Sequence, residues 1–237
     1  MFEHVCKRVV DRRYRGAMLN ADVPVQVLFT GFEPFGGDSH NPSWPAAQEA
    51  ASFLQERGIP AAAALLPCEF GGSGPALEEA LRRHRPQVVI TCGLAGGRAT
   101  VTVERVAVNL QDARIPDNAG HQPAGTPVVD DGPAAWFSTL PVKRVAASIQ
   151  GEGIPAELSL SAGSFVCNHV FALLMDRAAS HGVRAAGFIH VPWDAEHAPE
   201  GITQTLPADQ LARALSVAAE QALDPAADLD TPEGALH

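Results

Sequence analysis

Residues 161–171 place a cysteine where a helix is expected to begin. Small residues form a tight turn and an apolar-periodic segment follows, so the pattern predicts a strand, a sharp turn and a helix. The first backbone N–H groups of a helix lack internal partners and favour an anion, so a thiol at Cys167 should ionise more easily than a free thiol. The same groups can receive the oxygen of a carbonyl under attack. Cys167 is a candidate nucleophile; the alternative is a small buried cysteine without chemistry.

A second unusual position is a carboxylate inside the β-branched segment 101–110. If this segment is one strand, Glu104 shares its face with Thr102, Val106, Val108 and Leu110. A carboxylate beside valines is costly unless it has a charged or hydrogen-bonding partner. We therefore expect a histidine or an arginine opposite Glu104. The alternative is an edge strand on which Glu104 faces water.

Nine histidines compete for the role of a general base. His169 lies two positions from Cys167, and on a helix two such side chains point about 200° apart. Five others lie in polar loops or at helix ends, where solvated histidines are normal: His40, His84, His121, His181 and His197. His190 alone lies in a strongly apolar strand, near its carboxyl end. A lone core histidine is more often structural than catalytic. Three such positions together nevertheless fit one arrangement, in which Cys167 attacks, His190 takes its proton and Glu104 fixes the imidazole.

The elements that must position these residues alternate between strands and helices. Strands are predicted at 25–30, 61–66, 87–92, 101–110, 158–160 and 185–193. Helices are predicted at 41–56, 72–84, 132–137, 140–152, 207–223 and after the turn at Cys167. This alternation predicts a single α/β domain with a mostly parallel sheet and helices on both faces. Residues 111–132 form a long loop, which compact domains rarely carry unless it serves function or assembly.

The loop after the first strand has the sequence GFEPFGG, residues 31–37. It holds Phe32 and Phe35 in a segment that is too short to bury them in a core. In open α/β sheets such loops form the ligand crevice, where two aromatic walls would suit a small, flat, mostly apolar group. The alternative is that the rings pack on the adjacent helix. The loop contains no GxGxxG and no GK[ST], so it is not a phosphate loop.

Composition excludes several classes of partner. A net charge of −10 argues against nucleic-acid binding, which needs a basic face. No apolar run approaches the roughly 20 residues that cross a bilayer. The four cysteines lie far apart without zinc-site spacing, so we expect free thiols in a reducing cytoplasm and no metal centre.

The two ends of the chain differ from its centre. Residues 1–22 are mixed in charge, lack the apolar core of a secretory signal, and are expected to form a disordered extension. Residues 23–223 are expected to form the catalytic α/β domain. Residues 224–237 are rich in Ala, Asp and Pro and are expected to be a disordered tail.

Five segments of the chain resemble the motifs of one family, the pyrrolidone-carboxylate peptidases, which are the cytosolic pyroglutamyl-peptidase I enzymes. The segments are GFEPFGG (31–37), ERVAVN (104–109), RIPDN (114–118), GSFVCN (163–168) and FIHVP (188–192). The resemblance spans about residues 25–220, in order and without large gaps. Five motifs in register leave little room for a chance match.

The resemblance implies that Glu104, Cys167 and His190 form a catalytic triad. It implies a substrate pocket, with Arg114 close to its centre, formed by Phe32, Phe35, Asn41, Ile115, Phe165 and Val166. It also implies a twisted α/β sheet, no cofactor, and homotetramers in many members. Leu94 departs from relatives that carry Gln there, so a polar contact could be missing, and residues 1–22 have no counterpart.

The expected function is that of a cysteine exopeptidase, an omega peptidase that removes N-terminal pyroglutamate (5-oxoproline) from peptides through a thioester. A different class remains open, a non-catalytic α/β protein that binds a small metabolite on its Phe-lined loop. A nucleosidase or phosphorylase would need a phosphate or ribose site, and the sequence has no Gly-rich anion loop. A rapidly alkylated thiol of low pKa, modified with loss of hydrolysis, would distinguish the peptidase from the passive binder.

Overall fold

The central strands of the sheet are apolar on both faces. In the computed structural model, which describes residues 24–233, β1 (Val27–Phe32) lies between β2 (Ala61–Leu66) and β3 (Val88–Leu94), parallel to both. β8 (Ala185–Val191) pairs with β3, again parallel. Every residue of β1, β3 and β8 is buried, as expected for parallel strands covered on two sides.

The sheet ends in an edge of mixed direction. β4 (Val101–Glu104) runs antiparallel to β8, and β7 (Ala156–Ser159) runs parallel to β4. The strand order is β2-β1-β3-β8-β4-β7. The predicted α/β class with a mostly parallel sheet is therefore confirmed.

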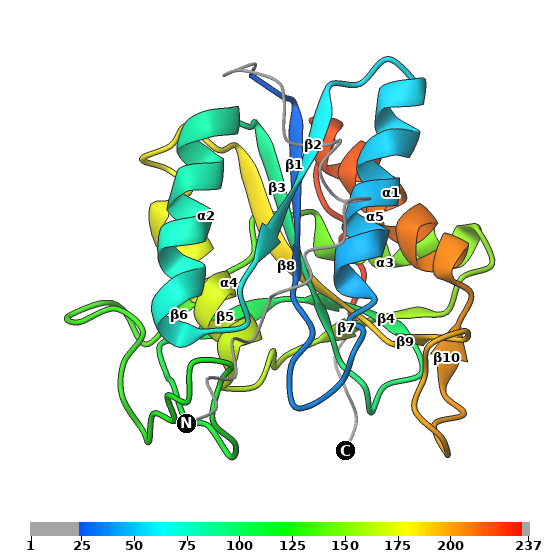
Figure 1. Cartoon of the computed structure of the whole chain (residues 1–237). Coiled ribbons are helices and arrows are strands. Elements are labelled where there is room, and N and C mark those ends of the chain that lie inside the picture. Colours follow the sequence, from blue (N-terminus) through cyan, green and yellow to red (C-terminus); the bar gives the residue numbers. More distant parts are fainter. Residues whose placement is uncertain (1–23, 234–237) are drawn as a thin grey trace, which may run out of the picture.

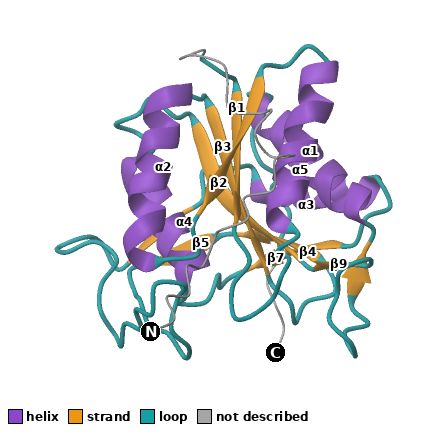
Figure 2. Cartoon of the chain, viewed as in Figure 1, coloured by secondary structure: helices purple, strands orange, loops and turns teal. Residues whose placement is uncertain are grey.

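Helices cover both faces of this sheet (Figures 1 and 2). One face carries α1 (Ser43–Glu56), α3 (Val142–Gly151) and α5 (Ala208–Leu223). The other face carries α2 (Phe70–His84) and α4 (Val166–Arg177). Each face of the sheet packs against its helices in a separate apolar core, and the sheet separates the two cores.

The segment 101–110 is not one strand, contrary to the prediction. β4 ends at Glu104, and β5 (Val106–Val108) leaves the main sheet to pair antiparallel with β6 (Ala135–Phe137). Glu104 consequently does not share a strand face with Val106, Val108 or Leu110. The predicted helix at 132–137 is also wrong, because its residues supply the partner strand that β5 needs after it has left the sheet.

The loop 111–132 is long, as predicted, and it is fastened to its neighbours. Between Leu110 and Gly132 the only ladder contact among the described residues is an isolated bridge between Gln111 and Thr126. The Asp117 carboxylate accepts a hydrogen bond of 2.8 Å from the backbone N–H of Phe70. This contact satisfies the first N–H of α2, which begins two residues earlier than predicted.

Two short strands, β9 (Trp193–Asp194) and β10 (Thr205–Leu206), pair in parallel beside the main sheet. Residues 224–233 contain no helix or strand, although the Asp228 carboxylate accepts hydrogen bonds from backbone N–H groups at the start of α3. The predicted extension 1–22 lies outside the described residues. No helix within residues 24–233 is long and apolar enough to cross a membrane.

Candidate active site

Cys167 is the second residue of α4, as predicted. Gly163 has φ +78°, a left-handed conformation that favours glycine, and the chain then passes through extended Phe165 into the helix. The first intrahelical hydrogen bond runs from the N–H of His169 to the carbonyl of Phe165. The N–H of Cys167 therefore has no carbonyl to bind within its own helix.

Gly93 of β3 leaves the space in which the Cys167 thiol lies against the sheet. A Cβ atom on Gly93 would lie 2.7 Å from the Cys167 Sγ and 2.8 Å from Cζ of Phe188, so the thiol occupies the space that a side chain would fill. Gly93 is the register partner of His190 on the neighbouring strand. Register partners on paired strands point to the same face, and the strands lie about 4.8 Å apart. Sγ and the His190 imidazole therefore share one face of the sheet at adjacent positions.

His190 and Glu104 form a buried pair. The His190 Nδ1 lies 2.8 Å from Glu104 Oε1, and the two residues are 4% and 0% exposed. An ionised carboxylate can only accept, so Nδ1 carries the proton and Nε2 is left with its lone pair. The predicted partner opposite Glu104 is confirmed, and the alternative of a solvated edge carboxylate is wrong.

Arg98 joins this pair to the turn before α4, and the sequence analysis did not single it out. Its Nη1 lies 2.6 Å from Glu104 Oε1 and also donates to the Thr102 hydroxyl, while its Nη2 donates to the Ser161 carbonyl at 2.9 Å. The expectation for Glu104 was a histidine or an arginine, and the structure supplies both. Arg98 follows β3 in a Gly-rich turn, which gave no sequence signal beyond its charge.

The environment sets the protonation of the pair. Burial acts to raise the pKa of Glu104, but the hydrogen bond and charge of His190, together with a hydrogen bond from Arg98, hold that pKa below its usual value. Burial lowers the pKa of His190, opposed by its hydrogen bond to Glu104 and by the charge of that carboxylate, and assisted by the Arg98 charge. At neutral pH the pair is a carboxylate beside a neutral imidazole, which is able to accept a proton.

The prediction that the Cys167 thiol ionises more easily than a free thiol is wrong for this structure. Burial raises the pKa of Cys167 well above its usual value; Cys68, Cys92 and Glu104 act in the same direction and Arg98 against it. The desolvation of a thiolate between the helix and the sheet outweighs the favourable helix terminus. Cys167 therefore rests as a thiol, and it needs a base beside it to react.

The two phenylalanines of the GFEPFGG loop have different surroundings. Phe32 is the last residue of β1 and is 1% exposed, so the expectation that this segment cannot bury both rings is wrong for Phe32. Phe35 is partly exposed, and its ring centroid lies 6.0 Å from that of Phe165. Phe165 in turn packs edge-on against Phe70 at 5.4 Å. Phe35 and Phe165 thus form an aromatic wall directly beside the start of α4.

Asn41 and Val166, two further residues of the expected pocket, are both buried. The Asn41 side chain donates to the Glu33 carbonyl at 3.0 Å and accepts from both the N–H and the hydroxyl of Ser43. Asn41 therefore braces the loop between β1 and α1. Val166 is 0% exposed and belongs to the core between the sheet and α4.

The long loop brings Arg114 and Ile115 to the same end of the molecule. The Ser164 hydroxyl donates to the Asp112 carbonyl at 2.7 Å, and the Asp112 N–H donates to the Ser164 carbonyl at 3.0 Å. This pair of hydrogen bonds anchors the loop beside the residue that precedes Phe165. Arg114 and Ile115, which follow Asp112 by two and three positions, are both exposed.

Two further polar residues of α4, Asn168 and His169, are buried, and the structure shows contacts that their sequence positions did not predict. Asn168, 0% exposed, accepts from the N–H of Val108 and donates to the carbonyls of Val108 and Leu110, so it fastens α4 to β5. His169 packs edge-on against Phe70, and burial, with help from the Arg177 charge, lowers its pKa to about 4. His169 is therefore a neutral packing residue at physiological pH.

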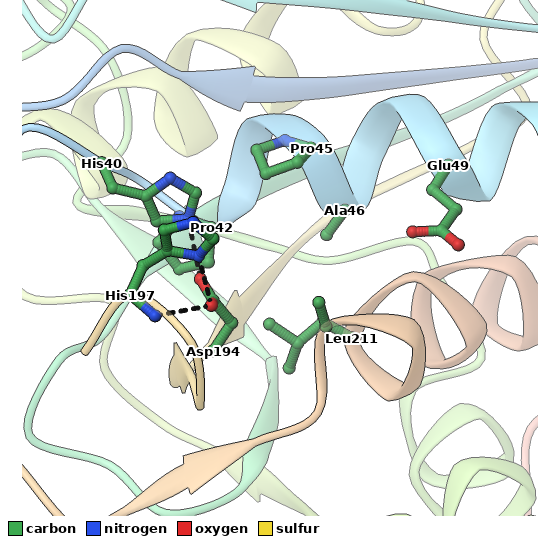
Figure 3. Close-up of a pocket in the computed structure, with 9 residues that line it drawn as sticks. His40, Pro42, Pro45, Ala46, Glu49, Asp194, His197 and Leu211 are labelled. Carbon is green, nitrogen blue, oxygen red and sulfur yellow. Dashed lines mark hydrogen bonds and ion pairs between the residues drawn. The ribbon is translucent and has the colours of Figure 1, made fainter.

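Two histidines that were expected to be solvated instead share one carboxylate. His40 Nε2 lies 2.7 Å from Asp194 Oδ2, and His197 Nδ1 lies 2.7 Å from Asp194 Oδ1 (Figure 3). His40 and Asp194 lie 154 positions apart along the chain, whereas Asp194 and His197 lie three apart. No local spacing could therefore indicate the whole cluster. It lies beyond the carboxyl end of the strand that carries His190.

The sequence profile of the pyroglutamyl peptidase family matches residues 25–225. The chain belongs to the pyroglutamyl peptidase family. It is 50% identical over 215 residues to the pyrrolidone-carboxylate peptidase of Streptomyces coelicolor, and this alignment covers 90% of this chain and 99% of that protein. It is 44% identical over 215 residues to the protein of the same name from Bacillus subtilis, which covers 90% and 99%. The chain is therefore a hydrolase, a peptidase of this family.

Solved structures of pyroglutamyl peptidases share the fold. The pyroglutamyl peptidase I of Bacillus amyloliquefaciens superposes with a TM-score of 0.81 at 42% identity, covering 88% of this chain and 100% of that one. The pyrrolidone carboxyl peptidase of Thermococcus litoralis gives 0.80 at 36% identity, covering 88% and 99%. Leu94, the departure noted above, lies at the end of β3 and is 9% exposed.

Proposed function

We propose that this member of the pyroglutamyl peptidase family removes N-terminal pyroglutamate from peptides with Cys167 as nucleophile, His190 as general base and Glu104 as the residue that orients the imidazole. The observation that carries the proposal is the position of the Cys167 Sγ against Gly93, in register with His190, whose Nδ1 lies 2.8 Å from Glu104. A thiol, an imidazole and a carboxylate in this order match the logic of a nucleophile, a base and an orienting group.

The substrate class fits the walls of the site. An N-terminal pyroglutamyl group is an uncharged five-membered lactam with one N–H and one C=O, and it has no free amine. A pocket for it needs apolar surfaces and very few hydrogen-bonding groups. Phe35 and Phe165 supply an aromatic surface beside Cys167. Phe32 is buried and is not assigned to the pocket wall. Because the Asn41 amide is engaged in the loop, we assign the lactam hydrogen bonds to backbone groups.

Acylation begins with proton transfer, because the raised pKa of the Cys167 thiol keeps it protonated at rest. The Cys167 proton moves to Nε2 of His190 as the sulfur attacks the carbonyl carbon next to the lactam ring. The Cys167 N–H, free of any partner within α4, donates to the developing oxyanion, and Arg114 is a second candidate donor. Glu104 stabilises the imidazolium that forms.

The tetrahedral intermediate collapses when His190 returns its proton to the leaving amine, which breaks the peptide bond and leaves a thioester on Cys167. Neutral His190 then takes a proton from water, and the hydroxide adds to the thioester carbonyl. Collapse of this second intermediate releases pyroglutamic acid, and the sulfur recovers a proton from His190. The cycle uses no cofactor.

The experiment that tests this function compares two arylamides of the same leaving group in the presence of a reductant. Pyroglutamyl-aminocoumarin should be hydrolysed, whereas prolyl-aminocoumarin should not. The two differ only in the lactam carbonyl, which makes the ring nitrogen uncharged. Equal rates on both, or hydrolysis of neither by the reduced and folded protein, would contradict the proposal. The second result would favour a passive metabolite-binding protein.

We extend the proposal to location and assembly. Among the described residues Cys68, Cys92 and Cys167 are all free thiols, which suits a cytoplasmic protein. Large apolar side chains that are exposed in the single chain fit a homo-oligomer, a tetramer by resemblance: Leu110, Ile115, Phe137 and Leu160. Light scattering after size-exclusion chromatography tests this, and a monomer at micromolar concentration would contradict it.

A further inference from the structure

A second cluster of ligating side chains lies outside the peptidase site. His40 follows the GFEPFGG loop, Asp194 is the last residue of β9, and His197 lies three residues further on. One ligand atom from each residue lies within 4.8 Å of those of the other two, and no other group of this kind occurs within residues 24–233. Figure 3 shows the two imidazoles and the carboxylate turned toward one another at one end of a pocket.

The carboxylate of this cluster is held in place by the backbone. Asp194 Oδ1 accepts from the N–H groups of Glu196 and His197 at 3.1 and 3.0 Å. Its side chain is only 3% exposed, whereas those of His40 and His197 are 24% and 50% exposed. The cluster thus consists of one buried carboxylate, held by backbone hydrogen bonds, and two more exposed imidazoles. Supporting hydrogen bonds of this type orient the ligands of protein metal sites.

The donor set selects a class of ion. Two imidazole nitrogens and one carboxylate oxygen suit zinc and similar divalent transition metals, whereas magnesium and calcium prefer oxygen ligands alone. In a tetrahedral site, metal–nitrogen and metal–oxygen bonds of about 2.0–2.2 Å place neighbouring ligand atoms roughly 3.3–3.6 Å apart. The two nitrogen–oxygen distances of 2.7 Å are shorter than this spacing, so an ion that replaces the two shared protons must move each nitrogen and its oxygen apart by roughly 0.6–0.9 Å.

One of the two imidazole rings must also turn. The His40 and His197 rings are stacked, with centroids 4.0 Å apart and an angle of 20° between their planes. Stacked rings do not aim both lone pairs at one point, so one ring must turn. His197 can do so, because half of its side chain is exposed and it lies in the segment between β9 and β10.

We propose that His40, Asp194 and His197 bind one divalent transition-metal ion of the zinc class, which fastens the loop between β1 and α1 to the end of β9. Three protein ligands leave at least one coordination position open toward the adjoining pocket, whose walls include Pro42, Pro45 and Leu211. The site stabilises two segments that flank the peptidase site, since the first carries Phe35 and the second follows His190. It does not depend on the proposed peptidase mechanism.

The test uses the untagged full chain carrying Cys167→Ala, so that the reactive thiol cannot bind the probe. Metal-free protein is titrated with Zn²⁺ in competition with a chromophoric chelator, and its melting temperature is recorded. We expect one Zn²⁺ per chain and a rise in melting temperature of roughly 5–10 °C at a free concentration about 100 times Kd. Asp194→Asn and His40→Gln should each weaken binding by at least about tenfold.

The matched control is His181→Gln, which removes another histidine that pairs with a single carboxylate, at 2.9 Å from Glu78. Binding should be unchanged in this variant. Co²⁺ provides a readout that does not depend on the variants: bound by nitrogen and oxygen alone, it shows d–d bands without a thiolate charge-transfer band. Absence of Zn²⁺ binding at micromolar free metal, a thiolate band, or equal affinity in Asp194→Asn and the parent would overturn the proposal.

Discussion

Two clusters built from the same kinds of side chain lie four residues apart on one segment of the chain. In the first, His190 donates to the fully buried Glu104, and Arg98 shares the same carboxylate oxygen. In the second, Asp194 lies between His40 and His197, and both imidazoles reach solvent. The residue types are nearly the same, but the burial and the third partner differ.

The difference shows how surroundings divide the roles of histidine. Burial and the Arg98 charge keep the pKa of His190 low, and the strand presents its remaining nitrogen to the face that carries the thiol. His40 and His197 are held by a carboxylate that accepts from both, beside water and a pocket. The first arrangement suits proton transfer, and the second suits the capture of a cation.

Removing one imidazole from each cluster should separate these roles most strongly. His190→Ala should lower kcat/KM on a pyroglutamyl arylamide by about 10²–10⁴-fold, because in the proposed mechanism the Cys167 thiol loses its base. His197→Ala should have a small effect, since that ring lies outside the proposed peptidase site. His181→Ala is the control for loss of a histidine elsewhere. Comparable losses at His190 and His197 would erase the distinction between the two clusters.

Gly93→Ala tests the packing that only the first cluster requires. The new Cβ would meet the Cys167 Sγ at 2.7 Å and the Phe188 ring at 2.8 Å, so the thiol must shift. A displacement of about 1 Å can cost about 10²-fold in rate, and we expect a loss of that order in kcat. Gly97→Ala, at a position with open space around it, is the matched control. Full activity of Gly93→Ala would show that the thiol does not act from this position.

Arg98→Met should change the pH profile more than the maximum rate. The Arg98 charge helps to lower the pKa of His190, so removing it should raise that pKa. His190 must be neutral to accept the thiol proton, and kcat/KM therefore falls as the pH drops through this pKa. In the parent protein the acid limb should lie below the ordinary histidine value of 6.5, and in Arg98→Met it should move to higher pH. An unmoved limb would leave Arg98 with a structural role alone.

The smallest predicted contrast is in stability, measured by urea unfolding with a chelator present. Glu104→Gln should lower the free energy of unfolding by about 1–3 kcal/mol, because the buried amide cannot accept as well from both His190 and Arg98. His40→Gln removes a part-exposed hydrogen bond to Asp194 and should cost about 0–1 kcal/mol. A larger loss of unfolding free energy in His40→Gln than in Glu104→Gln would contradict the expectation that the buried pair contributes more to stability.

Much of the fold could be predicted from local pattern. The strand at 61–66 was predicted to the residue, and the alternation of apolar strands and helices indicated the parallel sheet. The failures lie where partners decide structure. Residues 132–137 pair with β5 as a strand, and β5 itself leaves the main sheet after Glu104. Nothing in the local sequence of either segment specifies the other.

The candidate site divides in the same way. Glu104 and His190 could be predicted because each is a polar residue in an apolar strand, and their contact at 2.8 Å agrees with that prediction. Arg98 lies in a loop, where charges are ordinary, and its role depends on contacts that only the folded chain provides. The raised pKa of Cys167 was missed because the sequence indicates a helix terminus but not how the folded chain surrounds the thiol.

The central claim is that a sulfur atom lying over a glycine of β3 does the bond-breaking chemistry. The most direct measurement is kcat/KM of Cys167→Ala on pyroglutamyl-aminocoumarin, with circular dichroism and the melting temperature confirming a native fold. We predict that turnover falls to the background of the assay while the fold persists. Hydrolysis at the parent rate by folded Cys167→Ala would contradict the account.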